Sequence, residues 1–189
     1  MTLLATFQTL LHRYTGLDDI VVGTPVANRT RIETESLIGF FANTLVLRGD
    51  VSGDPSFDEL LARARTLTLE AHAHQDVPFE LLVEELQPER DLNRTPLFQI
   101  MLVMQNTPPP VISLPGVRVE RLALETTAPK FDLVLFLKES SGSLTASWEY
   151  NPARFDAETI SGLAAHFETL LESAVADPRQ RISQLNMLR

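Results

Sequence analysis

The sequence predicts an α/β protein: a layered sandwich with one mixed sheet and helices mainly on one of its faces. Two observations carry this prediction. Apolar residues recur at helical spacing in several segments, and short runs rich in Val, Ile and Leu, typical of strands, lie between them. Because the two kinds of segment are mixed along 189 residues, they favour a single layered unit over separate helical and sheet domains.

The first half of the chain contains two clear helical patterns. One begins almost at residue 1 and ends near Gly16, which leads us to expect that a longer polypeptide precedes Met1. The other follows Ser56, which forms a capping-box pattern with Glu59 before an apolar stripe. Short buried strands are expected at 20–22 and 44–47, and the polar segment 49–56 reads as a turn.

The second half begins with a short helix from Pro78, limited by Pro88. An apolar run at 97–104 predicts a central strand, and the prolines between residues 107 and 116 predict an extended crossing. Further strands are expected at 117–122, 131–137 and 144–150. The last helix is expected to start near Asp156 and to stop before Pro178.

Composition narrows the possible partners. The chain has no cysteine, so it offers neither a disulfide nor a thiolate nucleophile. Its net charge of -9, with 16 basic residues scattered among 25 acidic ones, argues against a nucleic-acid partner. No apolar run approaches the roughly 20 residues that span a bilayer, so we expect a soluble, cytoplasmic chain without a membrane partner.

The histidines do not form a metal-site pattern. His72 and His74, two positions apart on a helix, point in directions about 200° apart and do not chelate one ion. We therefore predict no metal site. His74, Gln75 and Asp76 are more simply explained as the end of one helix and the cap of the next, with direct substrate contact as the alternative.

Three other polar groups leave two interpretations open. Residues 23–29 follow a strand that we expect to end at Gly23, so Asn28 and Arg29 form either a plain turn or a binding group at a strand end. Asn43 either caps a strand or faces a cleft. Another group, Arg90, Asp91 and Arg94, is either a surface ion-pair cluster or a docking site for an adjacent lobe.

Four stretches occur in one order with characteristic gaps: VGTPVANR at 22–29, IGFFANTLVLR at 38–48, AHQDVPFE at 73–80 and RDLNRTPLFQ at 90–99. Each resembles a signature of the condensation domains of nonribosomal peptide synthetases. Members of that family are V-shaped pairs of chloramphenicol-acetyltransferase-like lobes. Residues 1–189 resemble the carboxy-terminal lobe alone, a single lobe of a two-lobed domain. The His-His-x-x-x-Asp-Gly segment that carries the family's catalysis does not occur in this sequence.

The resemblance implies a role in secondary-metabolite biosynthesis. The family joins aminoacyl or peptidyl groups held as thioesters on the phosphopantetheine arms of carrier proteins, in a tunnel between the lobes. The lobe is therefore expected to supply one tunnel wall, to hold no cofactor and no catalytic residue of its own, and to be inactive alone. The candidate tunnel-lining residues are Thr24, Pro25, Arg29, Phe41, Asn43 and Gln75.

The same resemblance implies the chain's partners. It assigns Arg90, Asp91 and Arg94 to lobe docking, and residues 97–125 to a latch that crosses to the other lobe. The expected partners are the amino-terminal lobe, peptidyl carrier proteins and a neighbouring adenylation domain. A bare interlobe face would also favour self-association. The alternatives are a stand-alone, non-catalytic module that docks a carrier protein and, more remotely, an acyltransferase that uses its own His74.

Overall fold

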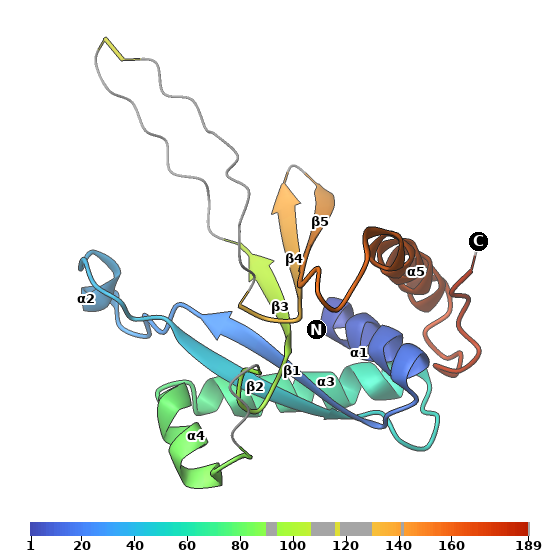
Figure 1. Ribbon diagram of the computed structural model, residues 1–189, viewed down its shortest axis with the longest axis horizontal. Coiled ribbons are helices and arrows are strands. Elements are labelled where there is room, and N and C mark those ends of the chain that lie inside the picture. The colour runs from blue at the N-terminus through green and yellow to red at the C-terminus, as the bar shows by residue number, and fades with distance from the viewer. Residues whose placement is uncertain (90–93, 107–115, 118–129, 141, 189) are drawn as a thin grey trace.

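A computed structural model describes residues 1–89, 94–106, 116–117, 130–140 and 142–188 (Figure 1). Among these residues five strands form one sheet in the order β2-β1-β3-β4-β5. The strands are β1 (Asp19–Val26), β2 (Asn43–Asp50), β3 (Ile100–Gln105), β4 (Leu133–Ser140) and β5 (Ser143–Tyr150). The central pairs β1–β3 and β3–β4 are parallel, whereas β1–β2 and β4–β5 are antiparallel. The predicted mixed sheet is confirmed.

Three long helices, α1 (Thr2–Thr15), α3 (Phe57–Ala73) and α5 (Ala157–Ala176), cover one face of the sheet. Helix α1 packs between α3 and α5, and Figure 1 shows the three on the same side. The main core lies between them and the sheet, where Phe7, Trp148 and Phe167 make edge-to-face ring contacts. The predicted arrangement, with helices mainly on one face, is therefore confirmed.

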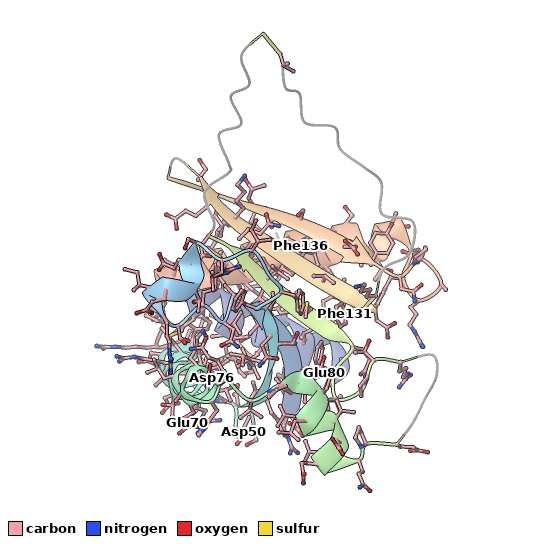
Figure 2. The ribbon with its side chains drawn as sticks, turned by 90° about the vertical axis from the view of Figure 1, so that its left-hand side faces the viewer. Asp50, Glu70, Asp76, Glu80, Phe131 and Phe136 are labelled. Atoms are coloured by element: carbon pink, nitrogen blue, oxygen red, sulfur yellow. The ribbon has the colours of Figure 1, made fainter. Side chains whose placement is uncertain are left out.

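The opposite face of the sheet carries a smaller apolar cluster around Phe98. The Phe98 ring lies 5.6 Å from Phe79, the first residue of α4 (Phe79–Leu86), and 5.4 Å from Phe131, measured between ring centroids. Figure 2 shows Phe136 on β4 and Phe131 just before that strand, with Glu80 marking α4 below them. Helix α4 thus partly covers the face that the three long helices leave open.

The predicted helix boundaries rest on the expected caps. At the start of α3, the Ser56 N–H donates to the Glu59 carboxylate at 2.9 Å, which completes the capping box. At the start of α5, the Thr159 N–H donates to Asp156 at 2.6 Å. Helix α1 ends at Gly16, whose φ of 69° is the left-handed conformation typical of a glycine that ends a helix.

Four details differ from the sequence prediction. The turn predicted at 49–56 begins only after Asp50, because β2 stays paired with β1 up to that residue. Strand β1 does not end at Gly23 but continues to Val26, because its pairing with β2 persists to the Val26–Asn43 pair. Its pairing with β3 is at Gly23, so Pro25, which has no N–H to donate, lies past the part of β1 that pairs with β3. Helix α2 (Ile32–Glu35), in the β1–β2 connection, was not predicted. The strand predicted at 97–104 begins only at Ile100, because Leu97 has a φ of 68°, which no strand residue adopts.

Two predictions fall largely or partly outside the described residues: the strand at 117–122, of which 118–122 are not described, and the latch at 97–125, of which 107–115 and 118–125 are not described. In the described part of the chain, no helix combines the length and the apolar character needed to cross a bilayer.

Candidate functional site

A cavity of about 510 Å³ lies where the three parallel strands of the sheet end. Its walls come from residues 24–30 at the end of β1, from Leu102 and Met104 of β3, and from Leu137 of β4. The first turn of α1 and the last turns of α3 close it from the helical side. Since open α/β sheets place ligands at the carboxyl ends of parallel strands, this is the fold's expected binding position.

Four of the six predicted lining residues border this cavity: Thr24, Pro25, Arg29 and Gln75. They come from two segments about fifty positions apart in the sequence: the end of β1 with the residues that follow it, and the residues just after α3. Phe41 and Asn43 do not line the cavity, but each contacts a segment that does. The structure therefore brings the two motif segments together at the cavity. Phe41 and Asn43 lie outside the cavity, in contact with residues that line it.

Arg29 organises the connection between β1 and β2. Its guanidinium donates to the main-chain carbonyls of Thr34, Leu37 (3.0 Å) and Gly39 (3.4 Å), and its Cζ lies 4.2 Å from the centre of the Phe41 ring. The fork of N–H donors of an arginine suits such convergent carbonyls, and the ring face attracts its positive charge. The Arg29 side chain thus holds several residues of the β1–β2 connection close to the edge of the cavity.

Asn43 links β2 to the connection between α3 and α4. Its Nδ2 donates to the carbonyls of Gln75 (2.8 Å) and Val77 (2.7 Å), and its Oδ1 accepts from the Phe79 N–H at 3.1 Å. Of the two interpretations left open for Asn43, the structure favours a cap, but for helix α4 rather than for its own strand. The predicted boundary at residues 74–76 is present, because α3 ends at Ala73 with His74 as its C-cap residue, whereas the cap of α4 comes from Asn43.

Three of the four histidines, His12, His72 and His166, have side-chain contacts within the described residues. His72 borders the cavity, and its Nδ1 lies 2.8 Å from the Thr68 carbonyl one turn earlier on α3. His12 contacts the Leu17 carbonyl at 2.8 Å, and His166 contacts the Tyr14 hydroxyl at 2.6 Å. Within the described residues, no three His, Cys, Asp or Glu side chains are placed to hold a metal ion.

Two further polar residues border the cavity: His72, which the sequence analysis did not propose as a wall residue, and Asn28, for which it left a plain turn and a binding group open. Asn28 has a φ of 50°, and its Oδ1 is buried without a hydrogen-bond partner in the described structure. The backbone conformation of Asn28 agrees with its residue type, since asparagine is enriched among residues with positive φ. Of the predicted docking residues, Arg94 is exposed, whereas Arg90 and Asp91 lie outside the described residues.

A second cavity, of about 530 Å³, lies between β2 and α3 and contains none of the predicted site residues. Its lining includes Gln8, Gly49 and Ala62. The Gln8 amide packs so closely on Gly49 that a Cβ at position 49 would lie 2.1 Å from its Nε2. Because the two cavities are similar in volume, a substitution in this one can serve as a control for a substitution in the first.

The chain resembles parts of large synthetases. It is 52% identical over 192 residues to one component of the linear gramicidin synthase of Brevibacillus parabrevis, covering 100% of this chain and 4% of that protein. It is 44% identical over 194 residues to CymA of Salinispora arenicola, a probable non-canonical nonribosomal peptide synthetase, covering 100% of this chain and 2% of that protein. The chain thus spans only a small fraction of these relatives.

Solved structures share the fold. The X-domain from teicoplanin biosynthesis superposes with a TM-score of 0.91 at 32% identity, over 99% of this chain and 43% of that chain. The first condensation domain of the CDA synthetase gives a TM-score of 0.78 at 23% identity, over 100% of this chain and 42% of that one, which supports the fold alone. The family model named condensation domain matches residues 1–189. With this match over its full length, the chain belongs to the condensation-domain family.

Proposed function

We propose that this chain is the carboxy-terminal lobe of a nonribosomal peptide synthetase condensation domain, and that its 510 Å³ cavity forms one wall of the reaction tunnel. The observation that carries the proposal is the meeting of Thr24, Arg29 and Gln75 at the carboxyl ends of the parallel strands. The match to 42% and 43% of two solved chains agrees with one lobe of two.

In the proposed reaction, the amine of the acceptor group attacks the thioester carbon of the donor group. A C–N bond forms, the C–S bond breaks, and the donor's pantetheine leaves as a thiol after the amine has lost a proton. The group that handles this proton lies outside the 189 residues, which lack the family's histidine segment. The amino-terminal lobe would supply it.

The contribution of this lobe is to position the two reactants. Holding two reactants in attack geometry lowers a barrier by about 7–11 kcal/mol, so a wall without a general base still affects the rate. Thr24 and Gln75 offer hydroxyl and amide groups that match the amides of a pantetheine arm, whereas Leu102 and Met104 offer an apolar surface. The phosphopantetheine would arrive on carrier proteins, and a neighbouring adenylation domain would activate the amino acids they carry.

The connection between β1 and β2 is the proposed interlobe surface. Ile32, Ile38 and Phe40 are 78%, 105% and 92% exposed, and Figure 1 shows α2 and its surroundings projecting away from the three long helices. Several large apolar side chains exposed together mark a contact surface. We assign it to the amino-terminal lobe and, in the isolated chain, to self-association. Arg90, Asp91 and Arg94 would add docking contacts. The latch would come from the part of residues 97–125 that follows β3, since Ile100–Gln105 lie in the centre of the sheet.

Titration with 4′-phosphopantetheine, followed by amide NMR shifts, tests the cavity assignment. We expect shifts at residues 24–30 and at Gln75, and their loss in Thr24→Trp, which fills the cavity. The matched control is Ala62→Trp, which places the same side chain in the 530 Å³ cavity and should leave the shifts unchanged. Shifts confined to the second cavity, or equal losses in both variants, would contradict the proposal.

A second candidate function is a docking module without chemistry. It is favoured by one observation: the teicoplanin X-domain, which resembles this chain at 32% identity with a TM-score of 0.89, has been solved in complex with OxyB. A member of this fold family therefore binds another protein. Carrier binding without peptide formation, even in the presence of the amino-terminal lobe, would favour this candidate over the first.

A further inference from the structure

Asn43, the first residue of β2, satisfies three main-chain groups at once. Its Nδ2 donates both protons, to the Gln75 and Val77 carbonyls at 2.8 and 2.7 Å, while its Oδ1 accepts from the Phe79 N–H at 3.1 Å. Carbonyl oxygens only accept and an amide N–H only donates, so the partners fix the orientation of the side-chain amide. No other residue type of this size supplies two donors and one acceptor.

These three partners span the whole connection between α3 and α4. Helix α3 ends at Ala73 and α4 begins at Phe79, after Pro78, which has no hydroxyl, amide or carboxylate to cap the helix. Asn43 provides that cap from a strand 36 positions away. Figure 2 labels Asp76, which lies within this connection, and Glu80, which lies in the first turn of α4.

Little else holds α4 in place. The helix has no buried residue, and its described packing consists of the contact of the Phe79 ring with Phe98 and the surrounding apolar cluster, together with a few contacts with β2. Asn43 therefore ties the residues just after α3 and the start of α4 to the first residue of β2. Without it, the connection would keep its local turns but lose these hydrogen bonds to β2.

That link sets one wall of the cavity. Gln75 borders the cavity, and its main-chain carbonyl is the one that accepts from Asn43. His72 borders the same cavity from α3, which itself packs against β2. We propose that Asn43 is a positioning residue, which sets where Gln75 stands at the reaction tunnel without touching the substrate. The inference rests on the proposed function for what the cavity binds, but not for the link itself.

The best test is a substitution that keeps the shape of the side chain. Asn43→Asp preserves size and acceptor but turns an oxygen toward two carbonyl oxygens, so the two donated hydrogen bonds become repulsive contacts. Asn43→Ser keeps one donor and one acceptor on a shorter side chain and serves if the first variant does not fold. The matched control is Asp156→Ala, which removes the cap of α5, a helix whose residues do not line the cavity.

Two measurements on the 189-residue chain decide the question: amide hydrogen exchange by NMR, and the Kd of 4′-phosphopantetheine. Asn43→Asp should speed exchange of the Phe79 amide, and of residues 74–82 around it, by about tenfold or more, and should weaken the Kd by about threefold or more. Asp156→Ala should lower the thermal stability of the chain while leaving the Kd and the exchange at Phe79 unchanged.

Unchanged exchange at Phe79 in Asn43→Asp would overturn the link. Faster exchange with an unchanged Kd would overturn the positioning role while leaving the cavity assignment intact. If the unsubstituted chain binds no 4′-phosphopantetheine, the proposed function and the positioning role both fail, and the exchange data still decide whether the link exists.

Discussion

The ring of Phe98 lies directly against the main chain of Gly23, so that a Cβ at position 23 would lie 2.2 Å from Phe98 Cε2. Phe98 is 2% exposed and is the centre of the apolar cluster opposite the three long helices. Glycine at position 23 therefore allows the segment before β3 to pack on β1. Gly23 belongs to the stretch VGTPVANR and Phe98 to RDLNRTPLFQ, so two of the family-like stretches pack directly against each other.

Gly23→Ala is predicted to destabilise the chain by about 1–3 kcal/mol, because the added methyl group would force the Phe98 ring out of its site. Urea unfolding measures the loss. Gly162→Ala, in α5, is the control: nothing lies within 4 Å of its added Cβ, so the same change should stabilise the chain by about 0.5–1 kcal/mol. Equal effects at the two positions would contradict the close packing.

Arg29→Lys is predicted to open the connection between β1 and β2. A lysine keeps the charge but cannot reach the carbonyls of Thr34, Leu37 and Gly39 together. Limited proteolysis should therefore cut residues 30–42 faster by about tenfold, as expected for a loss of about 1.4 kcal/mol in local stability. Arg31→Lys, at an exposed neighbour, should leave the rate unchanged; equal acceleration in both variants would argue against the Arg29 network.

Asp54 makes stability depend on acid pH. It accepts from the Ser183 hydroxyl at 2.8 Å and from the Ser183 N–H at 3.0 Å, and these hydrogen bonds hold the pKa of its carboxyl below the ordinary value. Since the folded pKa is lowered, the stabilisation is fully present above the unfolded pKa of about 3.9 and is lost as pH falls through the folded value.

The corresponding variant is Asp54→Asn, because asparagine tolerates the φ of 49° at this position. At pH 7 the variant should be less stable by about 1 kcal/mol or less, as expected for an exposed site. Thermal melts between pH 7 and pH 2.5 should show this difference shrinking below about pH 4. A difference that stays constant with pH would contradict the charge-dependent link to Ser183.

Phe40→Ser combined with Ile38→Asp is predicted to reduce self-association of the chain. Both side chains are almost fully exposed in the β1–β2 connection, so the change removes apolar surface without disturbing the core. Light scattering over a concentration series should show dimers for the unsubstituted chain and monomers for the variant. A strictly monomeric unsubstituted chain at high concentration would contradict the proposed interlobe surface.

Much of the fold could be predicted because its signals are local. The capping pair Ser56 and Glu59 lie three positions apart, and Asp156 lies three positions before the amide it caps, so both helix starts can be read directly from the sequence. Helix α2 could not be predicted in this way, because four residues do not establish a helical period.

The site was harder to predict, because its contacts are distant in sequence. The partners of Asn43 lie 32 to 36 positions away, so no local pattern distinguishes a cap for α4 from a group that faces a cleft. The end of β1 was misplaced for a similar reason: Pro25 normally interrupts a strand, and only its pairing with Thr44 of β2 shows that the strand continues. In both cases the structure depends on contacts between residues that are far apart in the sequence.

The most direct test of the account is peptide formation with the parts separated and recombined. The purified 189-residue chain, the amino-terminal lobe of a related condensation domain, and the two together are each mixed with two carrier proteins loaded with amino acids. Mass spectrometry of the acceptor carrier then detects the dipeptide. We predict a dipeptide only from the combined lobes, and a dipeptide from the 189-residue chain alone would contradict the account.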